Sequence, residues 1–407
     1  MKLQRRVVVT GLGLVSPLGN DVSSSWDACT KGISGISTFD NTINNSPVSI
    51  GGRIKDLDLS LYLDSKDTRR LDTFIQYGVV AASQAIADSG FLNYSTDLTR
   101  AGVNFGSGIG GIETIEKNHK VYLEKGYKKV SPFMVPGSII NMISGHISIK
   151  FGLRGSNVST VTACSSGNHC IGSAARSIAY GESDVMVAGG SEMASTPLAI
   201  SGFIAARALS TSNNPITASR PWDIDRDGFV LSDGAGAIIL EDLEHAKKRK
   251  ANIYAEIIGF GMSSDAFHMT APPEDGQGAA LSMTNAINDA EININDVDYI
   301  NAHGTSTPLG DLAEATAMKS IFKDKVPAIS STKSMTGHTL GAAGAIESIF
   351  SILTIKNNTI PPTINLDNQD PRCQLDFTPH IARESEVNIA CLLYTSDAAD
   401  EGLGVDL

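Results

Sequence analysis

The chain has 407 residues, with 32 basic and 44 acidic side chains and a net charge of −12 at pH 7. This charge argues against nucleic acid or an anionic membrane as a general partner, and no apolar run is long enough to span a bilayer. The N-terminus lacks a secretory signal, and the five cysteines show no CxxC spacing. We therefore expect a reduced, cytoplasmic protein without a metal site.

Strand-like runs alternate with helix-like segments along the chain. The alternation predicts an α/β protein with a largely buried sheet. The length allows two domains or one doubled domain, and no internal sequence repeat is visible. The expected strands cover residues 7–10, 102–105, 159–162, 185–188, 235–240, 254–258, 297–301, 328–331 and 387–390.

A glycine-rich turn follows the second of these strands. Gly106-Ser-Gly-Ile-Gly-Gly111 matches the GxGxxG fingerprint of dinucleotide-binding proteins. That pattern is weak alone, and no convincing acidic strand end follows about twenty residues later. We therefore expect no nucleotide or other cofactor.

Cys164 lies between an expected strand and an expected helix. It stands in Val-Thr-Ala-Cys-Ser-Ser-Gly, and small or apolar residues then recur at helical spacing up to Gly181. The free N–H groups and the dipole of a helix start favour the thiolate form, which is the nucleophile. The alternative is a buried, inert cysteine.

Two histidines follow strand ends in the C-terminal part of the chain. His303 stands in Ala-His-Gly-Thr-Ser-Thr-Pro, and His338 ends Lys-Ser-Met-Thr-Gly-His. Open α/β sheets place their sites just beyond the carboxyl ends of strands. Either histidine alone would be assigned to a solvated loop, but two in matching contexts beside a candidate nucleophile indicate an active site.

These motifs resemble the β-ketoacyl-acyl-carrier-protein synthase family, most closely the elongating type of bacterial fatty-acid synthesis. The likeness runs from about residue 5 to about residue 390. The other matching segments are Arg6-Val-Val-Val-Thr-Gly-Leu-Gly, Ser131-Pro-Phe-Met-Val-Pro, Arg220-Pro-Trp-Asp, Arg226-Asp-Gly-Phe-Val, Gly261-Met-Ser-Ser-Asp and Pro361-Pro-Thr-Ile-Asn.

The resemblance implies a thiolase fold, in which two duplicated halves form an α-β-α-β-α arrangement of layers. It places Cys164 in a first half, residues 1–250. It places His303 and His338 in a second half, residues 251–390.

The resemblance also implies the roles of individual residues. Cys164 would accept the acyl group, and His303 and His338 would stabilise an enolate. Lys333, paired with Glu347, would orient the site electrostatically. Thr305, Thr307 and Thr270 would meet the second substrate, and Ile109, Phe203 and Phe133 would line the acyl pocket, with Phe133 contributed across a homodimer interface. Acyl-carrier protein would dock on Lys66, Arg69, Arg70, Lys128, Lys129 and Arg207.

The implied reaction is a decarboxylating Claisen condensation of an acyl-enzyme with malonyl-acyl-carrier protein, giving a 3-oxoacyl-acyl-carrier protein. A CoA-using initiating synthase is disfavoured because it has Asn where His338 stands. A biosynthetic thiolase pairs its nucleophile with a second cysteine, and a non-catalytic chain-length subunit lacks the nucleophile. A polyketide-type ketosynthase remains an alternative. The sequence does not indicate which acyl-chain length or degree of unsaturation the protein prefers.

The C-terminus departs from the family. Where the family has an Asn-Ser-Phe-Gly-Phe-Gly-Gly-Thr-Asn loop and a last strand, this chain continues from Cys391 as Leu-Leu-Tyr-Thr-Ser-Asp-Ala-Ala-Asp-Glu. That string resembles translated sequencing adapter, so residues 391–407 are predicted to be a non-native tail. The family loop supplies the second oxyanion N–H, so we expect a crippled site and an exposed sheet edge. A catalytically inactive chain is therefore a further alternative.

Overall fold

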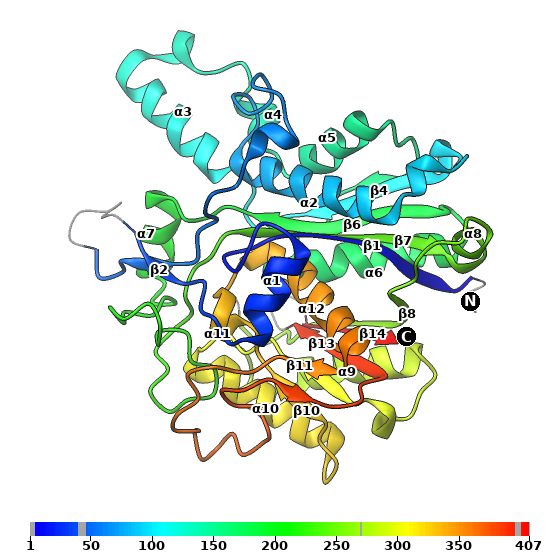
Figure 1. Cartoon of the computed structure of the whole chain (residues 1–407). Helices are drawn as coiled ribbons and strands as arrows, with labels where there is room; N and C mark the ends of the chain where they lie inside the picture. Colours follow the sequence, from blue (N-terminus) through cyan, green and yellow to red (C-terminus); the bar gives the residue numbers. More distant parts are fainter. Residues whose placement is uncertain (1–4, 40–45, 269–270, 395–399, 407) are drawn as a thin grey trace.

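The computed structural model describes residues 5–39, 46–268, 271–394 and 400–406, the last range for its backbone. Figure 1 shows five layers, in which two sets of strands alternate with three layers of helices. Buried strands feed helices that return across the sheet, which is the arrangement the alternating sequence pattern predicts.

The ten strands of the main sheet in the described chain form two sets of five. In the first set the spatial order is β1-β7-β6-β4-β5, and in the second it is β8-β14-β13-β9-β10. The first set comprises β1 (Val7–Val15), β4 (Ala101–Gly106), β5 (Asn157–Val158), β6 (Val185–Glu192) and β7 (Gly234–Asp242). The second set comprises β8 (Ala255–Ser263), β9 (Tyr299–Asn301), β10 (Ala328–Ser330), β13 (Ile389–Tyr394) and β14 (Asp400–Asp406).

The two sets repeat one topology. Each begins with two antiparallel pairings and ends with two parallel ones: β1 with β7 and β7 with β6, then β6 with β4 and β4 with β5. The same sequence of pairings runs from β8 to β10. A short antiparallel pairing of Val7–Val9 with Ala255–Ile257 joins the sets. The chain is therefore a structural duplication, as the resemblance implies, although its sequence shows no visible repeat.

Helices cover and separate the strand sets. α2 (Thr73–Ser89) and α5 (Met142–Phe151) lie on the outer face of the first set, and α9 (Gln277–Asp289) and α10 (Pro308–Phe322) form the opposite outer layer. α6 (Ser166–Ala179) and α12 (Ala343–Asn357) pack against each other between the sets. Because α12 meets protein on every side, every residue from Ala343 to Ile355 is buried.

Six further α-helices and two short strand pairs complete the α-helices and strands of the described residues. They are the helices α1 (Val22–Thr30), α3 (Ile112–Lys125), α4 (Met134–Ser138), α7 (Pro197–Ala205), α8 (Leu243–Lys248) and α11 (Lys333–Thr336), and the strand pairs β2 (Ser37–Thr38) with β3 (Ile50–Gly51) and β11 (Thr359–Ile360) with β12 (Arg383–Glu384). Among the described residues, no helix is both long and apolar enough to cross a membrane.

The expected strand at 159–162 is wrong in its position. The structure pairs Asn157–Val158 with β4 and leaves the next four residues irregular. Side chains take over the hydrogen bonding there: Ser159 Oγ lies 2.9 Å from Ser144 Oγ, and Thr162 Oγ1 lies 2.5 Å from His169 Nδ1. Serine and threonine compete with ladder bonding in this way, despite the β propensity of the threonines.

The expected exposure of a sheet edge at the C-terminus is also wrong. β13 pairs with β9, and β14 pairs with both β13 and β8, so these strands complete the second set. Ladder hydrogen bonds use only backbone groups, and the apolar side chains Leu392, Leu393 and Tyr394 are fully buried. The segment predicted to be non-native therefore fills the strand positions that the duplication requires.

Candidate active site

Cys164 lies at a strained turn that leads into α6. The turn is a 3-10 segment from Ala163 to Ser165, and Ala163 has φ of +50°, which is rare for a residue with a Cβ. Ser166 Oγ accepts from Thr162 N at 2.9 Å and donates to the Ala163 carbonyl at 2.7 Å, which holds the turn. The thiol of Cys164 is half-buried at the start of the helix, as the sequence predicts.

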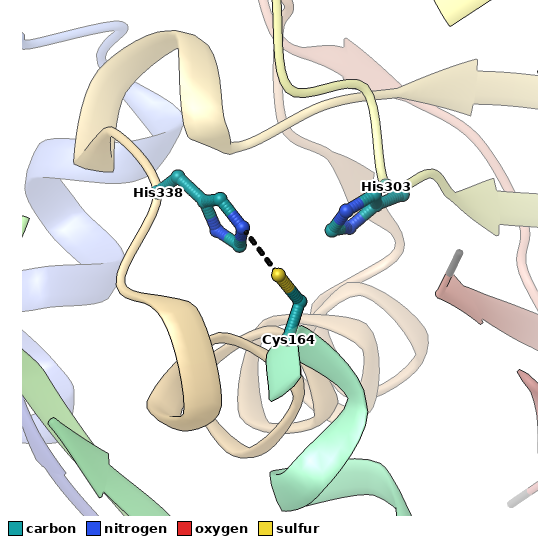
Figure 2. A group of neighbouring side chains, drawn as sticks. All are labelled: Cys164, His303 and His338. Carbon is teal, nitrogen blue, oxygen red and sulfur yellow. Dashed lines mark hydrogen bonds between the residues drawn. The ribbon is translucent and has the colours of Figure 1, made fainter. Parts of the chain in front are cut away.

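Both predicted histidines face this thiol. His338 Nε2 lies 2.9 Å from Cys164 Sγ. The rings of His303 and His338 lie 5.2 Å apart at 85°. Figure 2 shows His338 and His303 approaching the sulfur from two sides, on separate loops. Three residues far apart in the sequence therefore converge on one point.

Both imidazoles are held in the neutral form. Burial, reinforced by the nearby charge of Lys333, lowers the pKa of His338 well below its ordinary value. The pKa of His303 is lowered by burial, by Lys333 and by His338. A neutral ring has one N–H to donate and carries no charge of its own into the site.

The three side chains could also be considered as metal ligands. One donor atom from each of Cys164, His303 and His338 lies within 4.8 Å of the others. The 2.9 Å separation of Cys164 Sγ and His338 Nε2 is shorter than the roughly 3.5 Å between thiolate and imidazole ligands of a tetrahedral zinc. The spacing fits a hydrogen bond better than a shared ion.

Lys333 forms the ion pair with Glu347 that the sequence predicts. Its Nζ lies 2.7 and 2.8 Å from the two carboxylate oxygens, and both side chains are buried. Tyr394 was not anticipated here: its hydroxyl donates to Glu347 and lies 3.3 Å from Lys333 Nζ. Its ring centroid lies 4.8 Å from that of His303, so the first residues of the unusual C-terminus help to form the site wall.

Two buried carboxylates behind the His303 loop were missed from the sequence. Glu314 accepts from the backbone N–H groups of His303 at 2.6 Å and Gly304 at 2.8 Å, and burial raises its pKa to about 8. Asp311 accepts from Ser306 N at 3.1 Å, and burial raises its pKa to about 6. The available signal was two acids three residues apart in the first half of a helix that directly follows the loop and is mostly apolar or small there.

Glu192 was also missed, and it occupies the glycine-rich turn at residues 106–111. The carboxylate is fully buried at the end of β6, and burial raises its pKa. It accepts hydrogen bonds from Ser107 Oγ, Gly108 N, Ile109 N, Gly110 N and Gly341 N. Successive N–H groups of this kind form an anion-binding nest. Here the chain's own carboxylate fills the nest.

Two of the three predicted acyl-pocket residues lie with Cys164. Ile109, Phe203 and Cys164 border the same apolar cluster, and Phe229 connects it to His338 through ring contacts at 5.4 Å to Phe203 and 5.3 Å to His338. Phe133 lies elsewhere, exposed at the start of α4 beneath the guanidinium of Arg70 at 4.5 Å. A single chain therefore does not bring Phe133 into the pocket.

Two of the three threonines that the resemblance assigns to the second substrate, Thr305 and Thr307, lie on the His303 loop. Thr305 Oγ1 and Thr307 Oγ1 are 3.0 Å apart, and Thr307 is the residue immediately before α10. Thr305 is buried and Thr307 half-buried. Thr270 lies outside the described residues.

The predicted docking residues occupy three neighbouring segments. α3, which leads to the 3-10 turn Tyr127–Lys129, contacts both α4 and α7. The segment carrying Arg69 and Arg70 adjoins α4, since the Arg70 carbonyl lies 3.3 Å from the position of a Cβ on Gly137. All six side chains reach the surface, and Arg70 is the one that is half-buried.

Comparison with known proteins agrees with this geometry. Residues 4–246 match the model of the β-ketoacyl synthase N-terminal domain, and residues 254–367 match that of the C-terminal domain. The chain is 55% identical over 391 residues to a 3-oxoacyl-[acyl-carrier-protein] synthase 2 of Coxiella burnetii, covering 95% of this chain and 94% of that one. The enzyme of the same name from Staphylococcus aureus is 46% identical over 394 residues, covering 96% and 95%.

Solved structures show the same likeness. A β-ketoacyl synthase from Burkholderia phymatum superposes with a TM-score of 0.93 at 35% identity, covering 99% of both chains. A type II polyketide ketosynthase in complex with its acyl-carrier protein gives a TM-score of 0.91 at 32% identity, again covering 99% of both. These matches confirm the thiolase fold, and the chain therefore belongs to the β-ketoacyl synthase family.

Proposed function

We propose that this protein catalyses the chain-elongating condensation of fatty-acid synthesis, with Cys164, His303 and His338 as its catalytic residues. The observation that carries the proposal is the convergence of one thiol and two neutral imidazoles beside an apolar cluster. The curated relatives carry the corresponding name at 46–55% identity, which favours this reaction over that of the polyketide ketosynthase at 32%.

In the first step, the Cys164 thiolate attacks the carbonyl carbon of an acyl thioester on the carrier. A bond forms between Sγ and that carbon, and the carrier's sulfur leaves as a thiolate and takes up a proton. His338 supports the attacking form. Its Nδ1 is buried without a hydrogen-bond partner in the described chain, so we place the ring proton on Nε2, where it donates to the sulfur.

In the second step, a malonyl thioester loses CO2, and the electron pair of the broken bond becomes an enolate. Two imidazole N–H groups aimed at the enolate oxygen stabilise the developing charge. The carbanion then attacks the acyl carbon, the bond to Sγ breaks, and the thiolate is restored. We assign Thr305 and Thr307 to the pantetheine arm, since their hydroxyls lie on the loop of His303.

The exposed basic side chains around α3 and α7 suit an acidic carrier protein, because complementary charge accelerates association. A homodimer is a second part of the proposal. Apolar side chains stand exposed near the edge strand β5 and on α4, where a second copy would cover them and bring its Phe133 to the acyl pocket. They are Phe133, Val135, Ile139, Ile149, Val158 and Val161.

Acylation by an acyl-carrier thioester tests the proposal. Intact-mass measurement should show one acyl adduct on the protein, and the adduct should disappear in Cys164→Ala while remaining in Cys170→Ala, a buried cysteine on the helix that follows Cys164. Adding malonyl-acyl-carrier protein should then release 3-oxoacyl product. An adduct that survives Cys164→Ala would exclude this assignment.

A further inference from the structure

Glu192 touches parts of the site that the reaction uses at different times. Ile109, which borders the apolar cluster beside Cys164, donates its N–H to the carboxylate at 3.1 Å, and Gly108 donates at 2.6 Å. Gly341 donates at 3.0 Å from the turn that follows His338. One buried side chain therefore binds the wall of the acyl pocket and the segment of a catalytic histidine together.

The same turn also contacts the nucleophile. A Cβ on Gly108 would lie 3.3 Å from the Ala163 carbonyl and 3.4 Å from Gly341 N, so there is little space between the three segments. Ser166 Oγ, which holds the Cys164 turn, is 3.4 Å from the Ser107 carbonyl. A shift of the 107–110 turn must therefore move the backbone at Cys164 and at Gly341.

The carboxylate is costly to bury, and its hydrogen bonds offset part of that cost, since burial still raises its pKa. A buried ionised group is tolerated only when hydrogen bonds replace its water. The donors of Glu192 are four backbone N–H groups and the Ser107 hydroxyl, all of them neutral. Such bonds to a charge are about twice as strong as neutral ones, which makes the junction stiff.

We propose that Glu192 is a positioning residue that couples occupancy of the acyl pocket at Ile109 to the placement of His338. This inference rests on the proposed function and extends it to substrate selection. A chain long enough to displace Ile109 must strain the hydrogen bonds at Glu192, so the carboxylate sets how acyl-chain length affects both the acylation of Cys164 and the later decarboxylation.

Glu192→Gln tests the coupling, because the amide keeps the size but turns an N–H2 group toward N–H donors. Acylation of Cys164 by hexanoyl- and tetradecanoyl-acyl-carrier protein is measured separately from malonyl decarboxylation on the acylated enzyme. We expect the rate ratio between the two chain lengths to change by about tenfold, and decarboxylation to slow by a comparable factor. Glu192→Asp, which keeps the charge, should recover part of the ratio.

Asp298→Asn is the matched control, since Asp298 accepts two backbone N–H bonds from Asn388 and Ile389 outside the site; it should leave the chain-length ratio unchanged. If Glu192→Gln does not fold, Ser107→Ala removes one donor from the same carboxylate and should move the ratio in the same direction. Equal slowing with both chain lengths, or an unchanged ratio, would overturn the inference. Lack of acylation in the parent would instead overturn the proposed function.

Discussion

Each half contains a strained turn just before its central helix, which we call its elbow. The two halves use their elbows for different purposes. After β5, Ala163 has φ of +50° and opens a 3-10 turn before α6; after β10, Leu340 has φ of +47° and opens a 3-10 turn before α12. The residue after the strained position is Cys164 in one half and Gly341 in the other. These equivalent turns contact each other.

The difference shows how duplication makes an asymmetric site. The first half supplies Cys164, the proposed nucleophile, at its elbow, and the second half supplies His338 just before its own. Gly341 then offers only its N–H, to Glu192 at 3.0 Å. The ends of the matching strands β6 and β13 also differ, since Glu192 organises the first elbow's surroundings and Tyr394 contacts the Lys333–Glu347 pair.

The largest expected effect comes from the histidines that only the second half provides. His303→Ala and His338→Ala should each slow malonyl decarboxylation by about 100- to 1,000-fold, because each removes a donor to the enolate. Acyl transfer to Cys164 should persist in part. Single-turnover assays of the two half-reactions check this, and a variant that condenses at the parental rate would exclude its histidine from the role.

An effect of similar size, in the opposite direction, is expected at the C-terminus. Replacing residues 391–407 with the family's Gly-rich loop and final strand should raise condensation by about 100- to 1,000-fold, because a second oxyanion donor joins the N–H of Cys164. Thermal melts of both forms should be similar, since β13 and β14 already complete the strand set. Equal condensation rates would show that the present C-terminus is competent.

A smaller effect is expected from adding a Cβ at Gly341, the position that matches Cys164 in the first elbow. A Cβ on Gly341 would lie 2.2 Å from Gly108 N, so Gly341→Ala should lower the free energy of unfolding by about 1–3 kcal/mol and slow condensation. Gly202→Ala in α7, where a Cβ meets nothing within 4 Å, is the control and should be neutral or slightly stabilising. Denaturant titration measures both, and equal stability in the two variants would contradict the packing argument.

The pH profile of decarboxylation should reveal the protonation state of His303 and His338. Because the pKa values of His303 and His338 are lowered, both rings stay neutral as the pH falls through about 6.5, the ordinary histidine range. Decarboxylation should therefore stay constant there and fall only at lower pH. Lys333→Gln removes a charge that opposes protonation, so its acid limb should move to higher pH. Exposed Lys325→Gln should not move it, and coincident profiles for Lys333→Gln and the parent would refute the charge effect.

The smallest effect concerns the surface of the first half. Arg69→Glu with Lys128→Glu should raise KM for acyl-carrier protein roughly 5- to 30-fold, as expected for a few exposed charge contacts. Turnover of CoA thioesters should hardly change, and added salt should reduce the effect. Lys247→Glu with Lys248→Glu on α8, at the opposite side in Figure 1, is the control. A salt-independent loss with both substrates would indicate a structural role instead.

Motifs next to strand ends were sufficient to predict where the reacting groups meet. The separation of 174 residues between Cys164 and His338 was no obstacle, because the family pattern names both. Glu192 lies 84 residues from Gly108, and no local pattern marks it; only the pairing of β6 with β4 brings it beneath the turn. Sequence periodicity cannot supply that register.

The prediction of an exposed sheet edge at the C-terminus was wrong for a different reason. The origin of a segment says little about whether its backbone can complete a ladder, and Leu392, Leu393 and Tyr394 suit a buried strand. The predicted place of Phe133 in the pocket rests on the proposed homodimer, and the single chain leaves Phe133 exposed. The short strand β5 was misplaced because hydroxyl side chains replaced ladder bonds after Val158.

The strained elbows also bear on heat tolerance. Left-handed backbone costs a residue with a Cβ about 1–2 kcal/mol, and Ala163 and Leu340 both adopt it, against a typical total stability of about 5–15 kcal/mol. Glycine at either position would relieve the strain and loosen the turn. Glycine at 163 and 340 should therefore raise the melting temperature while it loosens the turns that place Cys164 and Gly341.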